Sequence, residues 1–290
     1  MRKPMEYTED NRAFAGGKAR MDDKTQKESG RSLKRGAIGK VLFAIVLFAA
    51  TALLVSATPL FSITGIEVSG NHFYDKSQIV IRSGLHVGQN GFAALRGGNP
   101  AQLASLRCAQ AEREVASACP YIKAAHVRYM PPHTIIIDVE ERSKSVVVPY
   151  FESGLIIDEE GVVVDIVKDY RLAELPVAYG LPVSGYEMGE LLAAGDKAGV
   201  GTVLELINAI RQVDRDSDEV FAWKIDSIDI SDPRNVKLAL NNGISVNLGD
   251  GSDLYYRLSM TKEIVAHGIG EGEPGEISFS NGARPVFAPG

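Results

Sequence analysis

The sequence predicts an α+β protein with a single transmembrane helix, followed by an extracytoplasmic α+β domain and a mainly antiparallel β domain with helices. Three observations lead to this prediction: an uncharged apolar run, a strand–helix–helix–strand–strand order after it, and short alternating apolar segments from Ser143 onward. The predicted parts are a disordered cytoplasmic tail, the transmembrane helix, the first domain, the β domain, and a terminal strand with a flexible tail, over residues 1–36, 37–61, 62–142, 143–268 and 269–290.

The run Val41–Phe61 contains no charged residue, and its 21 residues would span about 31 Å as a helix, close to the thickness of a bilayer's hydrocarbon core. Its polar residues, Thr51, Ser56 and Thr58, are too few to form the polar face of a helix in a soluble core. A cleaved signal peptide is the sharper alternative, because small residues at 55–57 offer a cleavage site. Forty residues precede the run, however, which favours a retained anchor.

The net charge of −6 conceals an asymmetry around this run. Residues 1–40 carry 11 Lys and Arg against 6 Asp and Glu, whereas residues 41–290 carry 20 against 31. The cations nearest the run are Arg31, Lys34, Arg35 and Lys40. By the positive-inside rule, the N-terminus stays in the cytoplasm and both domains lie outside it. An acidic exterior without a basic stripe argues against nucleic acid as a partner.

The first domain opens with a predicted strand at Ile63–Val68 and a turn at Ser69–Asn71. Asp75 and Gln78 have the capping-box spacing, so a short helix begins there and ends at Gly84.

Asn99-Pro100 starts a second helix that runs to Ala118. Leu103 and Leu106 point away from the apolar face of this helix, so its first turn is expected to form a separate piece. Two strands complete the domain, at Ile122–Met130 and Thr134–Glu140.

Two cysteines, Cys108 and Cys119, lie on the second helix and on the oxidising side of the membrane. In one continuous helix they share a face but stand about 16 Å apart, too far for a disulfide. Their neighbours on that face are small or apolar, which favours buried free thiols. A disulfide is the alternative, and it requires the helix to break between the two residues.

The second half consists mostly of short strands with two helices. Apolar residues at helical spacing from Val203 to Val213 predict one amphipathic helix, and a second is expected over Leu254–Ala266. A flexible linker over Gly268–Gly275 then leads to a short alternating strand at Glu276–Phe279. The other expected strands are 145–150, 154–158, 162–167 and a meander of 225–230, 235–240 and 244–248.

The sequence offers little catalytic, metal-binding or nucleotide-binding chemistry. None of the five histidines shares a metal-ligand spacing with a cysteine or another histidine. Asp214, Asp216 and Asp218 imitate the opening of a calcium loop, but Glu219 and Ile225 occupy the positions of its glycine and its bidentate glutamate. No glycine cluster has a dinucleotide-binding or P-loop pattern. We therefore expect a protein without catalytic residues, cofactor or metal.

The first domain contains three runs that together follow a known pattern: Phe61-x-Ile63-x-x-Ile66-x-Val68-x-Gly70-Asn71, Pro120-Tyr121-Ile122 and Pro132-x-Thr134-Ile135-x-Ile137-x-Val139-Glu140-Glu141-Arg142. With these runs it resembles a polypeptide-transport-associated (POTRA) domain, in particular the one just outside the membrane in the FtsQ/DivIB family of bacterial cell division proteins. The resemblance also covers the second half, where residues 228–248 and the helix after them are similar to the β domain of that family. The enlarged, Gly-rich connection Gly88–Asn99 departs from the family pattern.

The resemblance implies a non-catalytic scaffold of the divisome, held in the membrane around residues 41–61 and located at the septum. Its implied partners are small single-span coiled-coil proteins, FtsB/DivIC-like and FtsL-like. Glu276, Ile277, Ser278 and Phe279 resemble the strand that ends the family's β domain, where a partner is received, so we expect binding there by strand addition.

Phe279 has two interpretations, as an aromatic anchor for the partner or as a residue packed on its own β domain. Two other functions stay open. One is a secreted cell-wall enzyme, which requires cleavage after Ala57, and the other is a transport-type POTRA chaperone.

Overall fold

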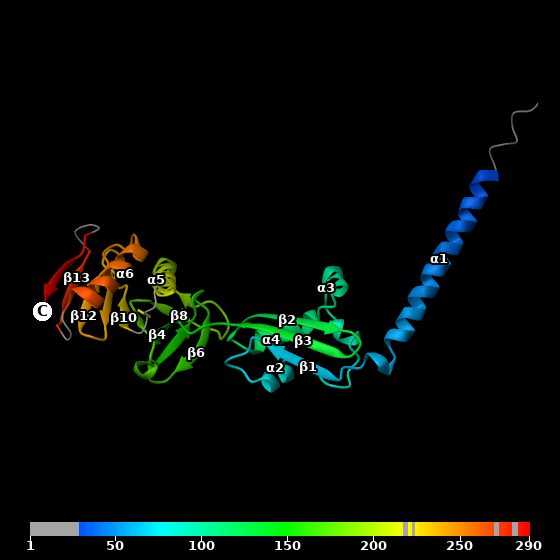
Figure 1. Ribbon diagram of the computed structural model, residues 1–290, viewed down its shortest axis with the longest axis horizontal. Coiled ribbons are helices and arrows are strands. Elements are labelled where there is room, and N and C mark those ends of the chain that lie inside the picture. Colours follow the sequence, from blue (N-terminus) through cyan, green and yellow to red (C-terminus); the bar gives the residue numbers. More distant parts are fainter. Residues whose placement is uncertain (1–28, 217–219, 222–223, 270–272, 280–283) are drawn as a thin grey trace, which may run out of the picture. The chain divides into compact units, whose positions relative to one another are not determined.

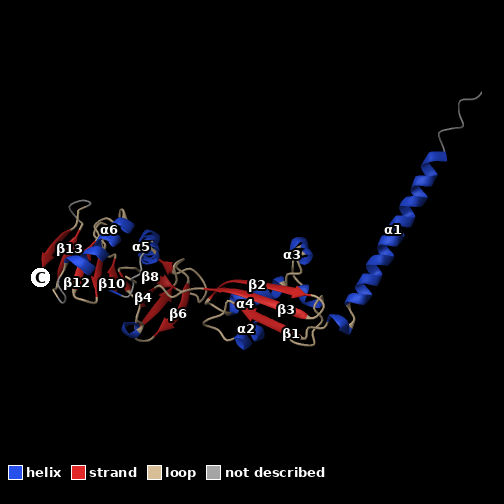
Figure 2. Cartoon of the chain, viewed as in Figure 1, coloured by secondary structure: helices blue, strands red, loops and turns tan. Residues whose placement is uncertain are grey.

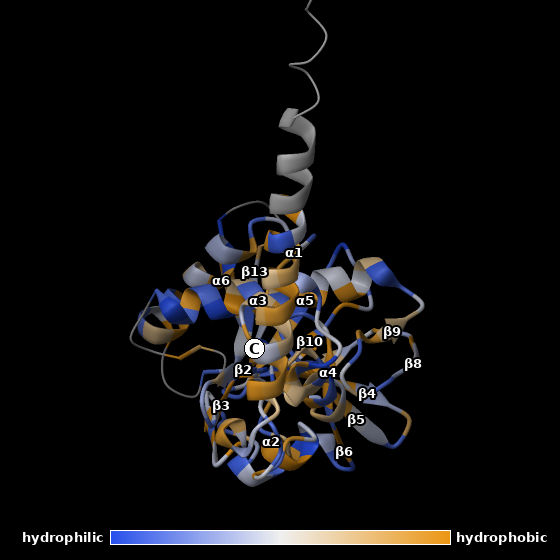
Figure 3. Cartoon of the chain, turned by 90° about the vertical axis from the view of Figure 1, so that its right-hand side faces the viewer, coloured by the Kyte–Doolittle hydropathy of each residue, from blue (hydrophilic) through white to orange (hydrophobic). Residues whose placement is uncertain are grey.

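The computed structural model describes residues 29–216, 220–221, 224–269, 273–279 and 284–290 and divides the chain into two units, residues 1–56 and 57–290. The first unit contains one long helix, α1 (Ser29–Ser56), within which Ile38–Ser56 is long and apolar enough to cross a membrane (Figure 3). Inside this stretch the Thr51 and Ser56 hydroxyls donate to the backbone oxygens of Leu47 and Leu53, both at 2.8 Å. These polar groups are therefore satisfied without water.

The observed helix differs from the expected span over 37–61 at both ends. It begins at Ser29, inside the segment that was expected to be disordered, and residues 1–28 of that segment lie outside the described residues. It ends at Ser56, and Pro59–Phe61 forms a separate 3-10 turn. Proline lacks the backbone N–H that would continue an α-helix, which accounts for the earlier end.

The POTRA-like domain has the expected strand and helix order (Figure 1). Its three-stranded sheet has the order β1-β3-β2, with β1 parallel to β3 and β2 antiparallel to β3. Helices α2 and α4 pack against each other and bury apolar side chains with the sheet. The elements are β1 (Gly65–Ser69), α2 (Lys76–Arg82), α3 (Pro100–Ala104), α4 (Ala109–Ala118), β2 (Ile122–Met130) and β3 (Thr134–Glu141).

Local sequence signals account for these helices. Asp75 and Gln78 make the predicted capping box at the start of α2, and Asn99 caps α3 through the backbone N–H of Gln102 at 2.9 Å. The predicted second helix is split, because Leu106 adopts a positive φ of 56° between α3 and α4. The expectation of a separate first turn is thereby confirmed.

The β domain is built on a mixed sheet of nine strands in the order β14-β13-β12-β11-β10-β7-β4-β5-β6. Five of the neighbouring pairs are antiparallel and three are parallel. Figure 2 shows α5 (Lys197–Arg215) and α6 (Leu254–Glu263) on the same side of this sheet, and the two helices contact each other. The strands are β4 (Val146–Tyr150), β5 (Ser153–Ile157), β6 (Val163–Val167), β7 (Val177–Tyr179), β10 (Ile225–Asp229), β11 (Lys237–Leu240), β12 (Ile244–Asn247), β13 (Gly275–Ser278) and β14 (Val286–Pro289).

The strands β4, β5 and β6 belong to both domains, because each buries both of its faces. Val146, Val147 and Val148 are all fully buried, and they alternate between two hydrophobic cores. One face packs with α5 in the core of the β domain, and the other packs with the POTRA-like domain. Successive strand residues point to opposite faces, which explains the continuous apolar runs Val146–Val148 of β4 and Leu155–Ile157 of β5. The residues facing the POTRA-like domain are Val147, Ile156 and Val164.

Candidate partner-binding edge

The strand expected to receive a partner lies next to one end of the nine-stranded sheet. β13 pairs in parallel with β12, so that Glu276 lies beside Ser245 and Ile277 beside Val246. Its other side pairs antiparallel with β14, which places Ile277 opposite Phe287. Both sides of β13 are therefore occupied, and β14 forms the edge of the sheet (Figure 1).

The four predicted site residues divide between the interior and the surface. Ile277 is fully buried and Phe279 is 1% exposed, and both belong to the core of the β domain. Glu276 is exposed and Ser278 is half-buried. In this arrangement Phe279 packs on its own domain, and its part in partner binding stays a prediction. Glu276 therefore has the most accessible side chain of the four in this arrangement.

The sequence reasoning missed β14 and instead expected a flexible tail after Phe279. Residues 286–289 follow one proline, Pro285, and end in another, Pro289, a composition that disfavours a strand away from an edge. The signal that could have revealed it is the apolar pair Val286-Phe287. Phe287 is half-buried and packs against the core of the β domain.

Gly275 makes the close pairing of β13 and β14 feasible. A Cβ atom at this position would lie 2.6 Å from the Ala288 backbone oxygen and as close to the Phe287 ring. Only a residue without a side chain fits there. The absence of a side chain at Gly275, the first residue of β13, thus allows β14 to pack closely against it.

A network of ion pairs lies where the two domains meet. Asp158, 1% exposed, accepts hydrogen bonds from the backbone N–H groups of Glu160 and Val162 at 2.9 and 2.8 Å. The Arg142 guanidinium donates to the carboxylates of Asp158 and Glu160 at 2.5 and 2.7 Å. The Lys123 amine lies 2.9 Å from Glu160. The buried Asp158 carboxylate is therefore both hydrogen-bonded and paired with a cation, as charged groups in protein interiors usually are.

The Glu160 carboxyl has a pKa below its usual value because Lys123 and Arg142 donate hydrogen bonds to its charged form. The same contact with Glu160 raises the pKa of Lys123. Both shifts favour the ionised forms of Lys123 and Glu160 at neutral pH. The network therefore serves as a structural joint, that is, a set of ion pairs linking the POTRA-like domain to the β domain.

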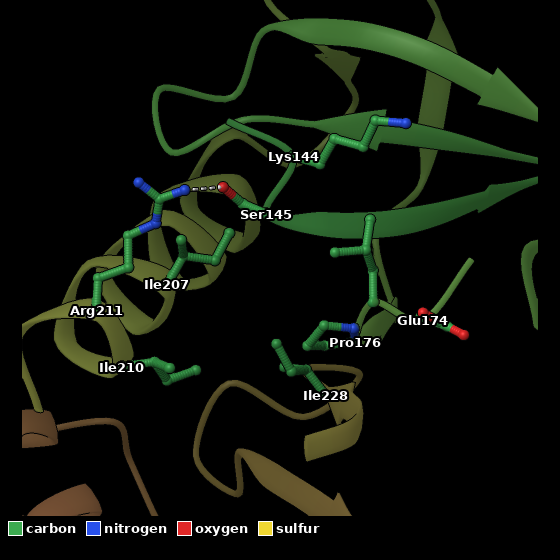
Figure 4. Close-up of a pocket in the computed structure, with 9 residues that line it drawn as sticks. Lys144, Ser145, Glu174, Pro176, Ile207, Ile210, Arg211 and Ile228 are labelled. Atoms are coloured by element: carbon green, nitrogen blue, oxygen red, sulfur yellow. Dashed lines mark hydrogen bonds between the residues drawn. The ribbon is translucent and has the colours of Figure 1, made fainter. Parts of the chain in front are cut away.

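A small pocket lies beside this joint (Figure 4). Its volume is about 210 Å³, and its floor is made of buried apolar side chains that include Ile207 and Ile228. Arg211 lines it, but this cation pairs with Glu159 and donates to the Ser145 hydroxyl at 2.9 Å. Burial lowers the pKa of Arg211. The pocket is therefore mainly apolar, and its arginine already has partners within the protein.

Within the described ranges, no group of three or more His, Cys, Asp or Glu residues could hold a metal ion. The acids near the end of α5 have structural partners: Asp214 accepts from the backbone N–H of Phe221, and Asp216 accepts from the Tyr255 hydroxyl at 2.9 Å. Asp218 lies outside the described residues.

An apolar helix long enough to cross a membrane, a POTRA-like domain and a sheet-rich β domain define a class of α+β proteins with one candidate membrane span in the described part of the chain. Comparison with known families agrees with this class. Residues 61–142 match the family described as "POTRA domain, FtsQ-type", and residues 150–277 match "Cell division protein FtsQ/DivIB, C-terminal". The chain belongs to the FtsQ/DivIB family of cell division proteins.

Two relatives have the same sequence identity to this chain and are matched over most of their length. The chain is 26% identical over 230 residues to "Cell division protein DivIB" of Clostridium acetobutylicum, covering 79% of this chain and 84% of that protein. It is also 26% identical over 214 residues to "Cell division protein FtsQ" of Corynebacterium glutamicum, covering 72% of this chain and 81% of the relative. The chain therefore matches most of the length of both proteins.

Proposed function

We propose that this protein is a non-catalytic, membrane-anchored scaffold of the cell division machinery. Its N-terminus lies in the cytoplasm, its two domains lie outside the membrane, and it recruits other division proteins at the septum. The family membership supports the role in division, the Ile38–Ser56 stretch supports the anchor, and the basic flank before it supports the orientation. The partners are small single-span coiled-coil proteins of the FtsB/DivIC-like and FtsL-like kinds.

The binding mode is strand addition at the terminal edge of the nine-stranded sheet, where the partner segment takes the place of β14 on β13. One observation carries this proposal: β14 is a short strand of residues 286–289 that ends in Pro289 and follows Pro285. Such a strand is a weak template for further pairing, because proline has no N–H to donate. β13 has no proline and is held firmly by its buried Ile277.

A second observation supports displacement of β14. The match to the family's C-terminal domain ends at residue 277, within β13, so β14 lies beyond it. Three of the four β14 residues are exposed, so removing this strand uncovers little apolar surface.

The test compares binding of the partner proteins to the wild-type chain and to three variants. A chain lacking residues 284–290 should bind them several-fold more tightly, since β13 is then free. Glu276→Arg should weaken binding, because this exposed side chain lies beside the new strand. Glu187→Arg, the same change at an exposed site on another part of the β domain, is the control and should bind like wild type.

Two results would contradict the binding mode. Loss of binding without residues 284–290 would mean that the partner uses β14 itself. Unchanged binding in all variants would place the interface elsewhere. Membrane fractionation tests the anchor separately, since a chain cleaved after Ala57 would appear in the soluble fraction.

A further inference from the structure

One end of the POTRA-like domain gathers the segments around the point where the chain enters it. We call this end the entry face and define it as residues 57–64, 84–107 and 128–134. Backbone hydrogen bonds hold the three segments together. They run from Ile63 N to Gln89 O, from Gly91 N to Phe61 O and from Thr64 N to His133 O, each at 2.8 Å, and from Tyr129 N to Leu106 O at 2.9 Å.

Large apolar side chains on the entry face are exposed, and they come from separate segments. Leu60 is 67% exposed, Val87 63%, Met130 47% and Leu103 43%. Three aromatic rings contact one another in the same segments: the rings of Phe61 and Phe92 and of Phe92 and Tyr129 meet edge-on with centroids 5.1 and 5.3 Å apart, and Tyr129 is buried while the two phenylalanines are half-buried. These exposed side chains therefore project from a rigid support.

The charge of the entry face has the opposite sign to that of its surroundings. Its three segments contain no Asp or Glu, although the chain beyond residue 40 carries 31 acidic residues. Among its basic residues Arg96 is exposed, while Arg107 is paired with the largely buried Glu112 at 2.8 Å. His86 and His133 are also exposed. The face thus combines exposed apolar side chains with basic groups, and its own segments contribute no acid. The nearest acids come from neighbouring elements, with Glu112 paired to Arg107, Asp138 to Arg128, and Glu114 beside Gly84 and Arg96.

We propose that the entry face rests on an anionic lipid surface. Leu60 follows Ser56, the last residue of α1, by four positions, so even a fully extended connection reaches only about 14 Å. Scattered apolar side chains among cations, in segments that contribute no acid, suit the interface of a membrane with anionic headgroups. The inference rests on the membrane anchoring of the proposed function, but not on strand addition at β13.

The experiment uses the full chain in liposomes whose acyl chains carry bromine, which quenches nearby tryptophan fluorescence. Trp223, the only native tryptophan, is replaced by Phe, and a reporter is introduced as Val87→Trp. Leu172→Trp is the matched control, since Leu172 is 78% exposed on the β domain. With phosphatidylglycerol in the liposomes, we expect quenching about twofold stronger at position 87 than at 172.

A charge change tests the electrostatic part of the proposal. Arg96→Glu should reduce the quenching at position 87, whereas Arg171→Glu, at an exposed arginine of the β domain, should leave it unchanged. Equal quenching at positions 87 and 172 would overturn the proposal. So would protection of position 87 that appears only when a second division protein is added, since the face would then bind protein. Flotation of the liposomes measures membrane anchoring independently. A chain that floats but shows no preferential quenching at position 87 would therefore contradict the lipid contact and not the anchor.

Discussion

The hydroxyl of Tyr121 donates a hydrogen bond to Asp165 Oδ2 at 2.7 Å and thereby joins the POTRA-like domain to strand β6 of the β domain. The Tyr121 ring stacks on Phe73 with centroids 3.8 Å apart. The Lys144 amine lies 5.4 Å from the ring centre and 3.4 Å from the Asp165 carboxylate. This contact adds a directional bond to the shared apolar core, so the two domains are expected to resist separation.

The first prediction concerns this hydrogen bond. Tyr121→Phe keeps the stacked ring but removes the hydroxyl, and we expect the free energy of unfolding to fall by about 1 kcal/mol, the usual size for one hydrogen bond. Chemical denaturation of the full chain measures it. Tyr186→Phe, at an exposed tyrosine, should have no effect.

A double-mutant cycle attributes the loss to the pair. In a background that carries Asp165→Ala, which removes the acceptor, Tyr121→Phe should cost less than it does alone. Equal costs in both backgrounds would mean that the loss comes from packing and not from this hydrogen bond.

The second prediction concerns acid stability. Burial by itself would raise the pKa of the Asp165 carboxyl, but hydrogen bonds from Tyr121 and the Ile166 backbone and the charge of Lys144 outweigh it, so the pKa is lowered. The pKa of Glu160 is lowered too. A folded-state pKa below the unfolded one contributes stability above the unfolded value, and this contribution is lost as pH falls through the folded pKa.

We therefore expect stability to decrease as pH falls below about 5, with a shallower decrease when both carboxyls are replaced, as in Asp165→Asn combined with Glu160→Gln. Thermal unfolding at a series of pH values measures this slope. An unchanged slope in the double variant would show that other carboxyls control acid unfolding.

The third prediction concerns the two thiols. Cys108 and Cys119 are fully buried and free, and they flank α4, a helix of ten residues that is about 15 Å long. Burial raises the pKa of the Cys108 thiol to about 11, and the charge of Glu112 adds to this effect. A protonated, buried thiol reacts slowly, because the thiolate is the nucleophile.

A thiol reagent at pH 8 should therefore find no reactive group in the folded chain and two per chain after unfolding without reductant. Fewer than two after unfolding would indicate a disulfide. Because the raised pKa favours the neutral thiol in the folded state, its contribution to stability is present below about pH 9 and is lost as pH rises towards 11. Cys108→Ala should remove this part of any alkaline destabilisation.

Much of the fold could be predicted from local patterns. The Asp75–Gln78 capping box, the strand that begins at Thr134 and the meander over 225–248 each depend on residues close together in sequence, and each element formed where it was expected. The double burial of Val146–Val148 was harder to foresee. A continuous apolar strand does not say which partner covers its second face, and that partner lies in the other domain.

At the terminal edge of the sheet, too, the local sequence predicted a strand but not the segments that pair with it. Glu276–Phe279 was predicted as a strand, and β13 formed almost at those residues. Its neighbours could not be predicted, because pairing with β12 and β14 depends on segments that lie apart in sequence. The position of Phe279 in the core followed from this pairing and not from its own sequence pattern.

The fourth prediction separates folding from binding at this edge. Phe279→Ala removes a fully packed ring from the core of the β domain, so we expect a loss of about 3–5 kcal/mol of stability, from lost burial and from the cavity that remains. Glu276→Ala, on the exposed side of the same strand, should change stability by less than about 0.5 kcal/mol. Denaturant unfolding of both variants measures this difference. Reduced partner binding by Phe279→Ala is then evidence for an anchor only if the variant is still folded in the assay. A stable Phe279→Ala variant that fails to bind would contradict the buried position of this ring and restore it as a contact residue.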